Sequence, residues 1–150
     1  MIKFKRIAIV GTGPRGVVAL ERLIAAISEE KSAVGVLIVL FESSAYAGCG
    51  PNYAPDQPLT DQLNIPLREI PINERPAVRG QFSYPSFPSF QAWYESENDP
   101  IVGGADTYPP RADVGRYLQA RFTTVIQSNA NASNQESSDT VANLELRRQS

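Results

Sequence analysis

The sequence predicts an α/β fold in which parallel strands alternate with helices, and three observations lead to this prediction. A short apolar run at residues 5–10 ends at a glycine, an amphipathic segment follows over residues 14–30, and a second apolar run covers residues 36–41. Strand, helix and strand within about forty residues form a βαβ unit, which joins two parallel strands. The 150-residue length is suitable for one domain.

The central helix and the second strand have clear sequence patterns. In residues 14–30, apolar side chains recur at helical spacing, at Val17, Leu20, Leu23, Ile24 and Ile27. Polar residues such as Glu21 and Arg22 lie off this stripe. Residues 36–41 are apolar at successive positions, which is typical of a strand that is covered on both faces of a parallel sheet.

A proline-rich stretch follows the second strand. Eight of the 12 prolines lie between Pro51 and Pro88, and proline interrupts helices because it lacks an N–H donor. The stretch also contains many large apolar side chains, which predict ordered packing rather than disorder. We therefore expect a long proline-rich loop segment, followed by a short helix at residues 88–96.

The C-terminal part has one more strong helix pattern. Residues 111–127 carry an apolar stripe formed by Val114, Tyr117, Leu118, Phe122 and Val125. Residues 128–140 are rich in serine and asparagine and are predicted to be flexible, whereas residues 141–150 are expected to form a further strand or a tail. Residues 1–127 thus make up the predicted domain.

Composition excludes several classes of function. The chain has no histidine, and its only cysteine is Cys49. This excludes histidine-based nucleophile systems, an internal disulfide and a histidine- or thiolate-ligated metal site, so we expect no metal. The net charge of −2 and the absence of a basic cluster argue against a nucleic-acid partner. The longest apolar run is too short for a membrane span, and we expect a cytoplasmic protein.

The glycine motif carries the functional prediction. Gly11, Thr12, Gly13, Pro14, Arg15 and Gly16 match the pattern G-x-G-x-x-G between a predicted strand and a predicted helix. The first glycine permits the tight turn, the second lets a pyrophosphate approach the backbone, and the third lets the helix pack closely. Exposed N–H groups and the helix dipole favour an anion there. This context predicts a Rossmann-like dinucleotide-binding domain.

Two charged residues belong to the same predicted site. Arg15 lies in the first turn of the helix, where the dipole disfavours a cation, so we expect it to face either a phosphate or a nearby glutamate. Glu42 ends the second strand, where a carboxylate can accept the ribose hydroxyls of an adenosine and repel a 2′-phosphate. NADP is therefore disfavoured at this site, and the alternative for Glu42 is a solvated strand end.

The glycine turn is the first of an ordered set of motifs over about residues 5–125. The later ones are Gly48-Cys49-Gly50 with Tyr53 and Pro58, Leu63-Asn64-Ile65-Pro66, Phe90-Gln91-Ala92-Trp93, and Pro110-Arg111 with Gly115-Arg116-Tyr117-Leu118. With this ordered set the chain resembles the FAD–NAD(P)-binding family of flavoproteins. The resemblance implies that FAD occupies this half, with the three motif glycines at the pyrophosphate and Glu42 at the ribose.

The resemblance also implies further contacts to the cofactor. Gly48 and Gly50 would approach the cofactor through their backbones, and Asn64 and Arg111 would lie on the flavin side of the cleft. The alternatives are that Asn64 bonds its own backbone and that Arg111 pairs with Asp113. Cys49 lacks a second cysteine to resolve it, which favours a small, partly buried residue over a redox thiol.

Only one glycine turn of this type is present, whereas complete members of the family carry a second one for NAD(P)H. The chain is thus expected to be the FAD-binding N-terminal portion of an NAD(P)H-dependent flavin oxidoreductase or monooxygenase. It would be incomplete alone, and a second chain is a possible source of the missing half. No catalytic residue is predicted. The alternatives are an NAD-binding Rossmann protein, a remnant without catalysis, and, less favoured, an S-adenosylmethionine site.

Overall fold

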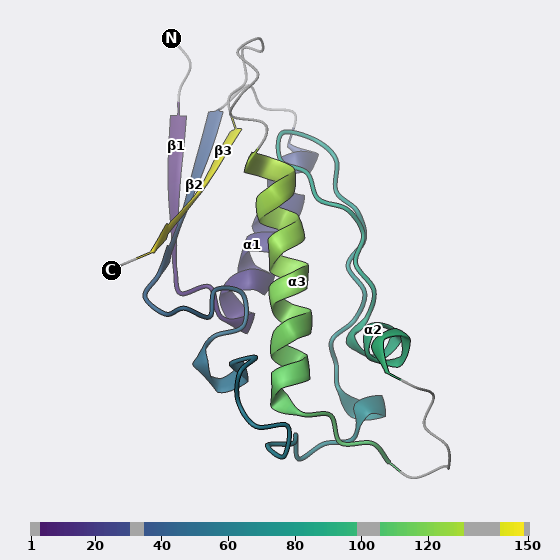
Figure 1. Ribbon diagram of the computed structural model, residues 1–150. Coiled ribbons are helices and arrows are strands. Elements are labelled where there is room, and N and C mark those ends of the chain that lie inside the picture. Colours follow the sequence, from purple (N-terminus) through teal and green to yellow (C-terminus); the bar gives the residue numbers. More distant parts are fainter. Residues whose placement is uncertain (1–3, 31–34, 99–105, 131–141, 149–150) are drawn as a thin grey trace.

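The computed structural model describes residues 4–30, 35–98, 106–130 and 142–148. In chain order, the elements are β1 (Phe4–Val10), α1 (Pro14–Glu29), β2 (Gly35–Glu42), the short 3₁₀ turns η1 (Pro51–Tyr53) and η2 (Leu67–Glu69), α2 (Phe90–Glu97), α3 (Arg111–Ala130) and β3 (Ala142–Arg148). In Figure 1 the strands lie beside the long helices α1 and α3, and the chain that follows β2 runs along α3 on its way to α2.

The three strands form one parallel sheet in the order β1-β2-β3. In the register, Ile38 of β2 lies between Ile7 of β1 and Leu144 of β3. The unit β1-α1-β2 is the predicted βαβ unit, and the expected α/β Rossmann-like fold with parallel strands is confirmed. The predicted strand within residues 141–150 is β3.

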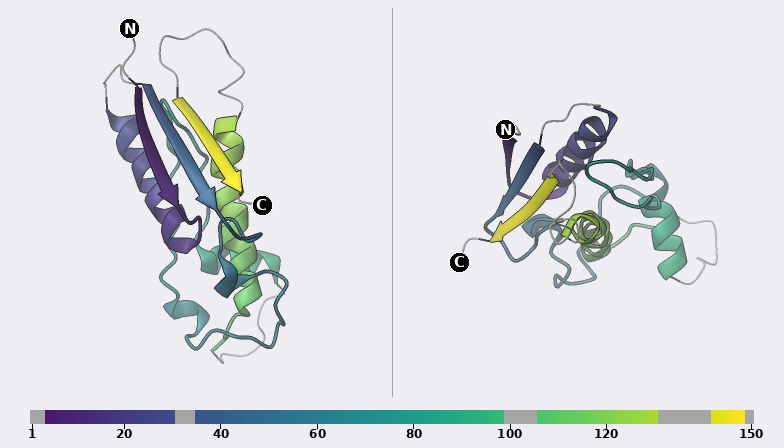
Figure 2. Two further views of the ribbon diagram at one scale, coloured as in Figure 1. Left: turned by 90° about the vertical axis from the view of Figure 1, so that its left-hand side faces the viewer. Right: turned by 90° about the horizontal axis from the view of Figure 1, so that it is seen from above.

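Both long helices lie on the same face of the sheet, as the two views of Figure 2 show. Alternate residues of β2 are buried against them, namely Val36, Ile38 and Leu40. On the opposite face, Leu37, Val39 and Phe41 are half-buried. The expectation that this strand is covered on both faces is therefore met on one face only within the described residues.

The long proline-rich segment is ordered, as predicted, and much of it packs against α3. A second apolar cluster forms here from Cys49, Leu67, Phe90, Tyr94, Val114, Tyr117 and Leu118. Within the segment, two antiparallel bridges, Arg75 with Phe87 and Val78 with Tyr84, shape an arm over residues 75–87. Helix α3 contributes to both this cluster and the cluster under the sheet.

Two helix ends differ from the predicted ones. Helix α2 begins at Phe90, because the Ser89 side chain caps it by accepting a hydrogen bond from the Ala92 N–H at 3.2 Å. Helix α3 continues to Ala130, three residues into the segment predicted to be flexible. Asn129 is buried there and exchanges two hydrogen bonds with the backbone of Ser83. The rest of that predicted segment lies outside the described residues.

Candidate functional site

The glycine turn between β1 and α1 borders an open hollow of about 850 Å³. The hollow lies at the carboxyl end of the strands, where parallel α/β sheets bind their ligands. It is lined by Ile9, Val10, Gly11, Gly13, Pro14, Arg15, Gly16, Ala19, Cys49, Gly50, Pro51, Asn52 and Tyr53. Six of the predicted site residues thus lie around one cavity: Gly11, Gly13, Pro14, Arg15, Gly16 and Gly50.

The first turn of α1 presents unpaired amide groups at this hollow. Gly13 is the N-cap and has no side chain to cap the helix, and the first turn contains no acidic residue. The N–H groups of Gly13, Arg15 and Gly16 have no acceptor among the residues that the structure describes. Such N–H groups, together with the positive end of the helix dipole, attract an anion.

Close backbone packing explains the spacing of the glycines. A Cβ atom on Gly16 would overlap the carbonyl oxygen of Gly11, so any larger residue would push α1 away from the turn. Across the hollow, Gly50 has a positive φ of 72°, and a Cβ atom there would lie 3.5 Å from the Cα of Gly13. Two stretches of bare backbone therefore face each other at the start of α1.

Glu42 lies behind the turn rather than on the wall of the hollow. Its Oε2 accepts hydrogen bonds from the Thr12 N–H at 2.8 Å and the Thr12 hydroxyl at 2.7 Å. Its Oε1 accepts from the N–H and the hydroxyl of Ser44, both at 2.9 Å. Glu42 is only 7% exposed and Thr12 only 1%, so the alternative of a solvated strand end is wrong.

These four hydrogen bonds keep the Glu42 carboxylate ionised. Burial by itself would raise the pKa of this carboxyl, but the hydrogen bonds from Thr12 and Ser44 outweigh burial and lower the pKa from 4.5 to about 2. The carboxylate thus ties the glycine turn to the end of β2. The sequence analysis missed Ser44, although a hydroxyl two residues from a carboxylate is a common local hydrogen-bonding pattern.

Arg15 is exposed on the wall of the hollow. The ion pair with a nearby glutamate that we considered for it is not formed within the described part of the chain. Its guanidinium is therefore available to a ligand at the same place as the unpaired amides.

Gly48 and Cys49 are held mainly by packing. A Cβ atom on Gly48 would lie 2.9 Å from the Cβ of Phe122 in α3, and the Gly48 N–H donates to the Thr12 carbonyl at 2.8 Å. The contact of Gly48 with a cofactor stays a prediction. Cys49 is fully buried, more deeply than expected, and burial raises the pKa of its thiol to about 11. A thiol in this state is protonated at neutral pH and is a poor nucleophile.

Asn64 and Arg111 lie away from the hollow, beside the N-terminus of α3. Both are exposed, and neither side chain lines the hollow. The Arg111 N–H donates to the Asp61 carbonyl at 2.8 Å. Asp113 pairs with Arg116 instead of Arg111, so that alternative for Arg111 is wrong. The flavin contacts of Asn64 and Arg111 stay predictions.

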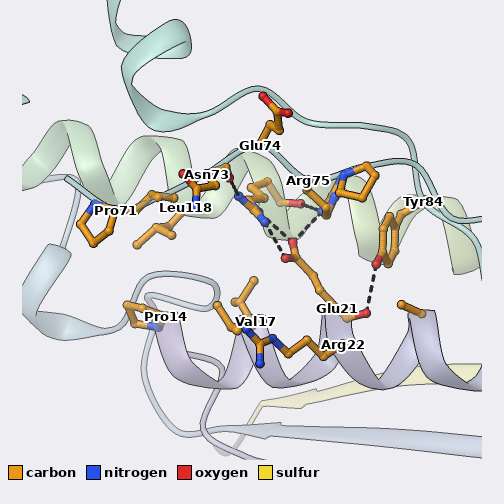
Figure 3. A pocket seen from close by; sticks show the side chains of 15 residues that line it. Pro14, Val17, Glu21, Arg22, Pro71, Asn73, Glu74, Arg75, Tyr84 and Leu118 are labelled. Carbon is orange, nitrogen blue, oxygen red and sulfur yellow. Dashed lines mark hydrogen bonds and ion pairs between the residues drawn. The ribbon is translucent and has the colours of Figure 1, made fainter. Parts of the chain in front are cut away.

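A second hollow of about 440 Å³ lies between α1, α3 and residues 71–76, and Figure 3 shows Glu21 at its centre. Glu21 accepts from Arg75 at 2.8 Å and from two nitrogens of Arg121 at 2.8 and 2.9 Å. Its carboxylate is buried with Arg75, beside the half-buried Arg121, which corrects the expectation that Glu21 lies on the polar side of the helix. Because both carboxylate oxygens of Glu21 are paired with arginine nitrogens, this cluster serves to join α1, α3 and residues 71–76.

The comparisons with known proteins agree with the geometry of the glycine turn. The model of a protein family described as FAD-NAD(P)-binding matches residues 8–150. This chain belongs to the FAD-NAD(P)-binding family. Membership of this family assigns a flavin or nicotinamide dinucleotide as the kind of ligand.

The chain is also similar to a much longer protein, nitrosuccinic acid synthase of Aspergillus oryzae. The two are 30% identical over 123 residues, which is 81% of this chain and 18% of that protein. The chain therefore spans less than a fifth of the length of this relative.

The described part of the chain holds neither a cluster of metal ligands nor a membrane-crossing helix. Within residues 4–30, 35–98, 106–130 and 142–148, no three histidine, cysteine, aspartate or glutamate residues come together as a metal site. Over the same residues, no helix combines the length and the apolar character that crossing a membrane requires.

Proposed function

We propose that this chain is the FAD-binding portion of an NAD(P)H-dependent flavin oxidoreductase. The observation that carries the proposal is the set of unpaired N–H groups at Gly13, Arg15 and Gly16, which open on a hollow faced by the bare backbone of Gly50. A diphosphate is the ligand that such a cradle fits best, because it combines two negative charges with several acceptor oxygens.

The residues at and behind the glycine turn then each have a physical task toward the cofactor. The N–H groups of the first turn of α1 would donate to the diphosphate, and Arg15 would neutralise part of its charge. Glu42, placed behind the turn, would hold the adenosine ribose. When bound, FAD supplies the hydride-transfer chemistry, and the residues of this chain bind and orient it.

The name of the similar Aspergillus oryzae protein indicates which class of flavin reaction to propose. Nitrosuccinic acid is a dicarboxylic acid that carries an oxidised nitrogen, so oxygenation at nitrogen is the flavin reaction that this likeness favours. We propose further that the reaction needs residues beyond these 150, because the sequence contains a single G-x-G-x-x-G turn and so lacks a second one for NAD(P)H.

A ligand titration with one matched pair of variants tests the proposal. Gly13→Ala adds one methyl group to the cradle, yet its Cβ would lie 3.9 Å from the nearest atom, so the fold should tolerate it. Ala26→Ser is the control, because Ala26 is exposed on the same helix and lines neither hollow. Calorimetry and quenching of flavin fluorescence would measure binding of FAD, NAD and NADP.

We expect the wild type and Ala26→Ser to bind FAD equally, and Gly13→Ala to bind it at least about tenfold more weakly, since one displaced charged hydrogen bond contributes about 1.5–3 kcal/mol. Tighter binding of NAD than of FAD would favour the NAD-binding alternative. Absence of binding for all three dinucleotides would refute the proposal.

A further inference from the structure

The two oxygens of the Glu42 carboxylate lie in different surroundings. The Oε2 bonds to Thr12 are buried, whereas the Oε1 bonds to Ser44 are only partly buried. Each oxygen accepts one backbone N–H and one hydroxyl. A carboxylate offers about four acceptor positions in all, so the protein itself fills every position that an incoming ribose would need.

The four groups that donate hydrogen bonds to Glu42 differ in how readily a ligand can displace them. The two N–H groups are fixed by the backbone, and the Thr12 backbone is held in addition by the Gly48 N–H, which donates to its carbonyl at 2.8 Å. A hydroxyl can turn away by rotation of one side-chain bond. For Ser44 this rotation also gives up the hydrogen bond that its Oγ accepts from the Tyr46 N–H at 3.2 Å, which is longer than the 2.9 Å bonds at Glu42. Of the two hydroxyls, that of Thr12 is enclosed, with Thr12 only 1% exposed, while Ser44 is half-buried. A ligand arriving from solvent therefore meets Oε1 and the Ser44 hydroxyl first.

We propose that the Ser44 hydroxyl holds the place of a ribose hydroxyl at Glu42 Oε1, and that nucleotide binding displaces it while Thr12 keeps Oε2 in position. This inference rests on the proposed function. It makes Ser44 a residue that sets the affinity for adenosine-containing ligands, and Thr12 a positioning residue that acts through Glu42.

The proposal predicts opposite effects for the two hydroxyls. Ser44→Ala removes the competitor and leaves one acceptor position of Glu42 open, so ADP and FAD should bind about threefold to tenfold more tightly. Thr12→Val removes the anchor and should weaken binding by a similar factor, while Thr12→Ser should restore it. If Ser44 instead contacts the ribose directly, Ser44→Ala weakens binding and the proposal is overturned.

A pair of ligands with and without ribose hydroxyls provides a second test, in the wild type and in one variant. ADP and 2′,3′-dideoxy-ADP would be titrated into the wild type and Ser44→Ala by calorimetry, with far-UV circular dichroism as the check of folding. The gain from Ser44→Ala should appear with ADP and vanish with the dideoxy ligand, which has no hydroxyl to place at Oε1. Equal binding of both ligands to the wild type would show that Glu42 holds no ribose and would overturn the inference.

The outcomes separate this inference from the proposed function. If the wild type binds FAD and ADP but the Ser44 and ligand changes have no effect, only the inference fails. If neither the wild type nor any variant binds FAD or ADP, the proposed function fails, and the inference fails with it.

Discussion

At the scale of single residues, Glu42 shows how one carboxylate serves the glycine turn. It ends β2, yet it bonds Thr12 in the turn after β1 and so fixes two neighbouring strand ends to each other. The same hydrogen bonds lower its pKa to about 2. A group whose pKa is lower in the folded state stabilises the fold above its ordinary pKa and loses that contribution as the pH falls toward the folded value.

The stability of the protein should therefore depend on pH through Glu42. The contribution is fully present above about pH 4.5 and declines toward pH 2, and the shift corresponds to about 3 kcal/mol in total. Between pH 6 and pH 3 the wild type should lose about 2 kcal/mol more of its free energy of unfolding than Glu42→Gln does. Urea unfolding at both pH values measures this difference. Glu69→Gln, at an exposed glutamate, is the control, and equal losses in the wild type and Glu42→Gln would contradict the prediction.

At the scale of elements, a buried charged cluster joins α1, α3 and the arm over residues 75–87. Arg75 is 3% exposed, donates to Glu21, to two backbone carbonyls and to Thr124, and lies 4.5 Å from the centre of the Tyr84 ring. Only its Nε lacks a partner among the described residues. The Tyr84 hydroxyl donates to the Glu21 carbonyl, which completes the attachment of the arm to α1.

Neutralising Glu21 should weaken this junction strongly. Glu21→Gln keeps the size of the side chain but leaves the buried Arg75 and the half-buried Arg121 without a carboxylate, a change that costs about 3–5 kcal/mol. Glu29→Gln, at an exposed position of the same helix, should change stability by no more than about 0.5 kcal/mol. Thermal unfolding followed by circular dichroism compares the two, and similar melting temperatures would show that the cluster contributes little.

At the scale of the whole molecule, α3 connects two apolar clusters. Its Phe122 and Val125 pack under the sheet, whereas Val114, Tyr117 and Leu118 pack against the proline-rich segment and α2. Trp93, the only tryptophan of the chain, lies in the second cluster and contacts the Tyr117 ring edge-on. Its fluorescence therefore reports on one cluster, while circular dichroism reports on all the helices.

We expect the two clusters to unfold together because one continuous helix belongs to both. Val125→Ala, in the cluster under the sheet, should lower the melting temperature seen by Trp93 fluorescence in the other cluster, by a few degrees for each kcal/mol lost. The transitions followed by fluorescence and by circular dichroism should coincide. If the variant shifts only the circular dichroism signal, the two clusters unfold independently.

Much of the fold could be predicted because its determinants are local. The apolar run of β2, the helical stripe of α1 and the glycine spacing each lie within a short window, and the structure has the strand, helix and turn that they indicate. Proline and glycine likewise marked the irregular segment before α2. The ends of α2 and α3 were less predictable, because Ser89 and Asn129 act through hydrogen bonds that depend on the surrounding chain.

The amino-acid sequence alone was enough to place a strand, a glycine turn and a helix in succession, since backbone geometry at that turn depends on a few adjacent residues. The roles of the charged residues became visible only in the folded chain. Glu42 bonds Thr12, 30 positions away, and Glu21 bonds Arg121, 100 positions away. Such pairings arise from packing between distant segments, and burial, which no local pattern encodes, decides whether a carboxylate faces solvent, a ligand or an arginine.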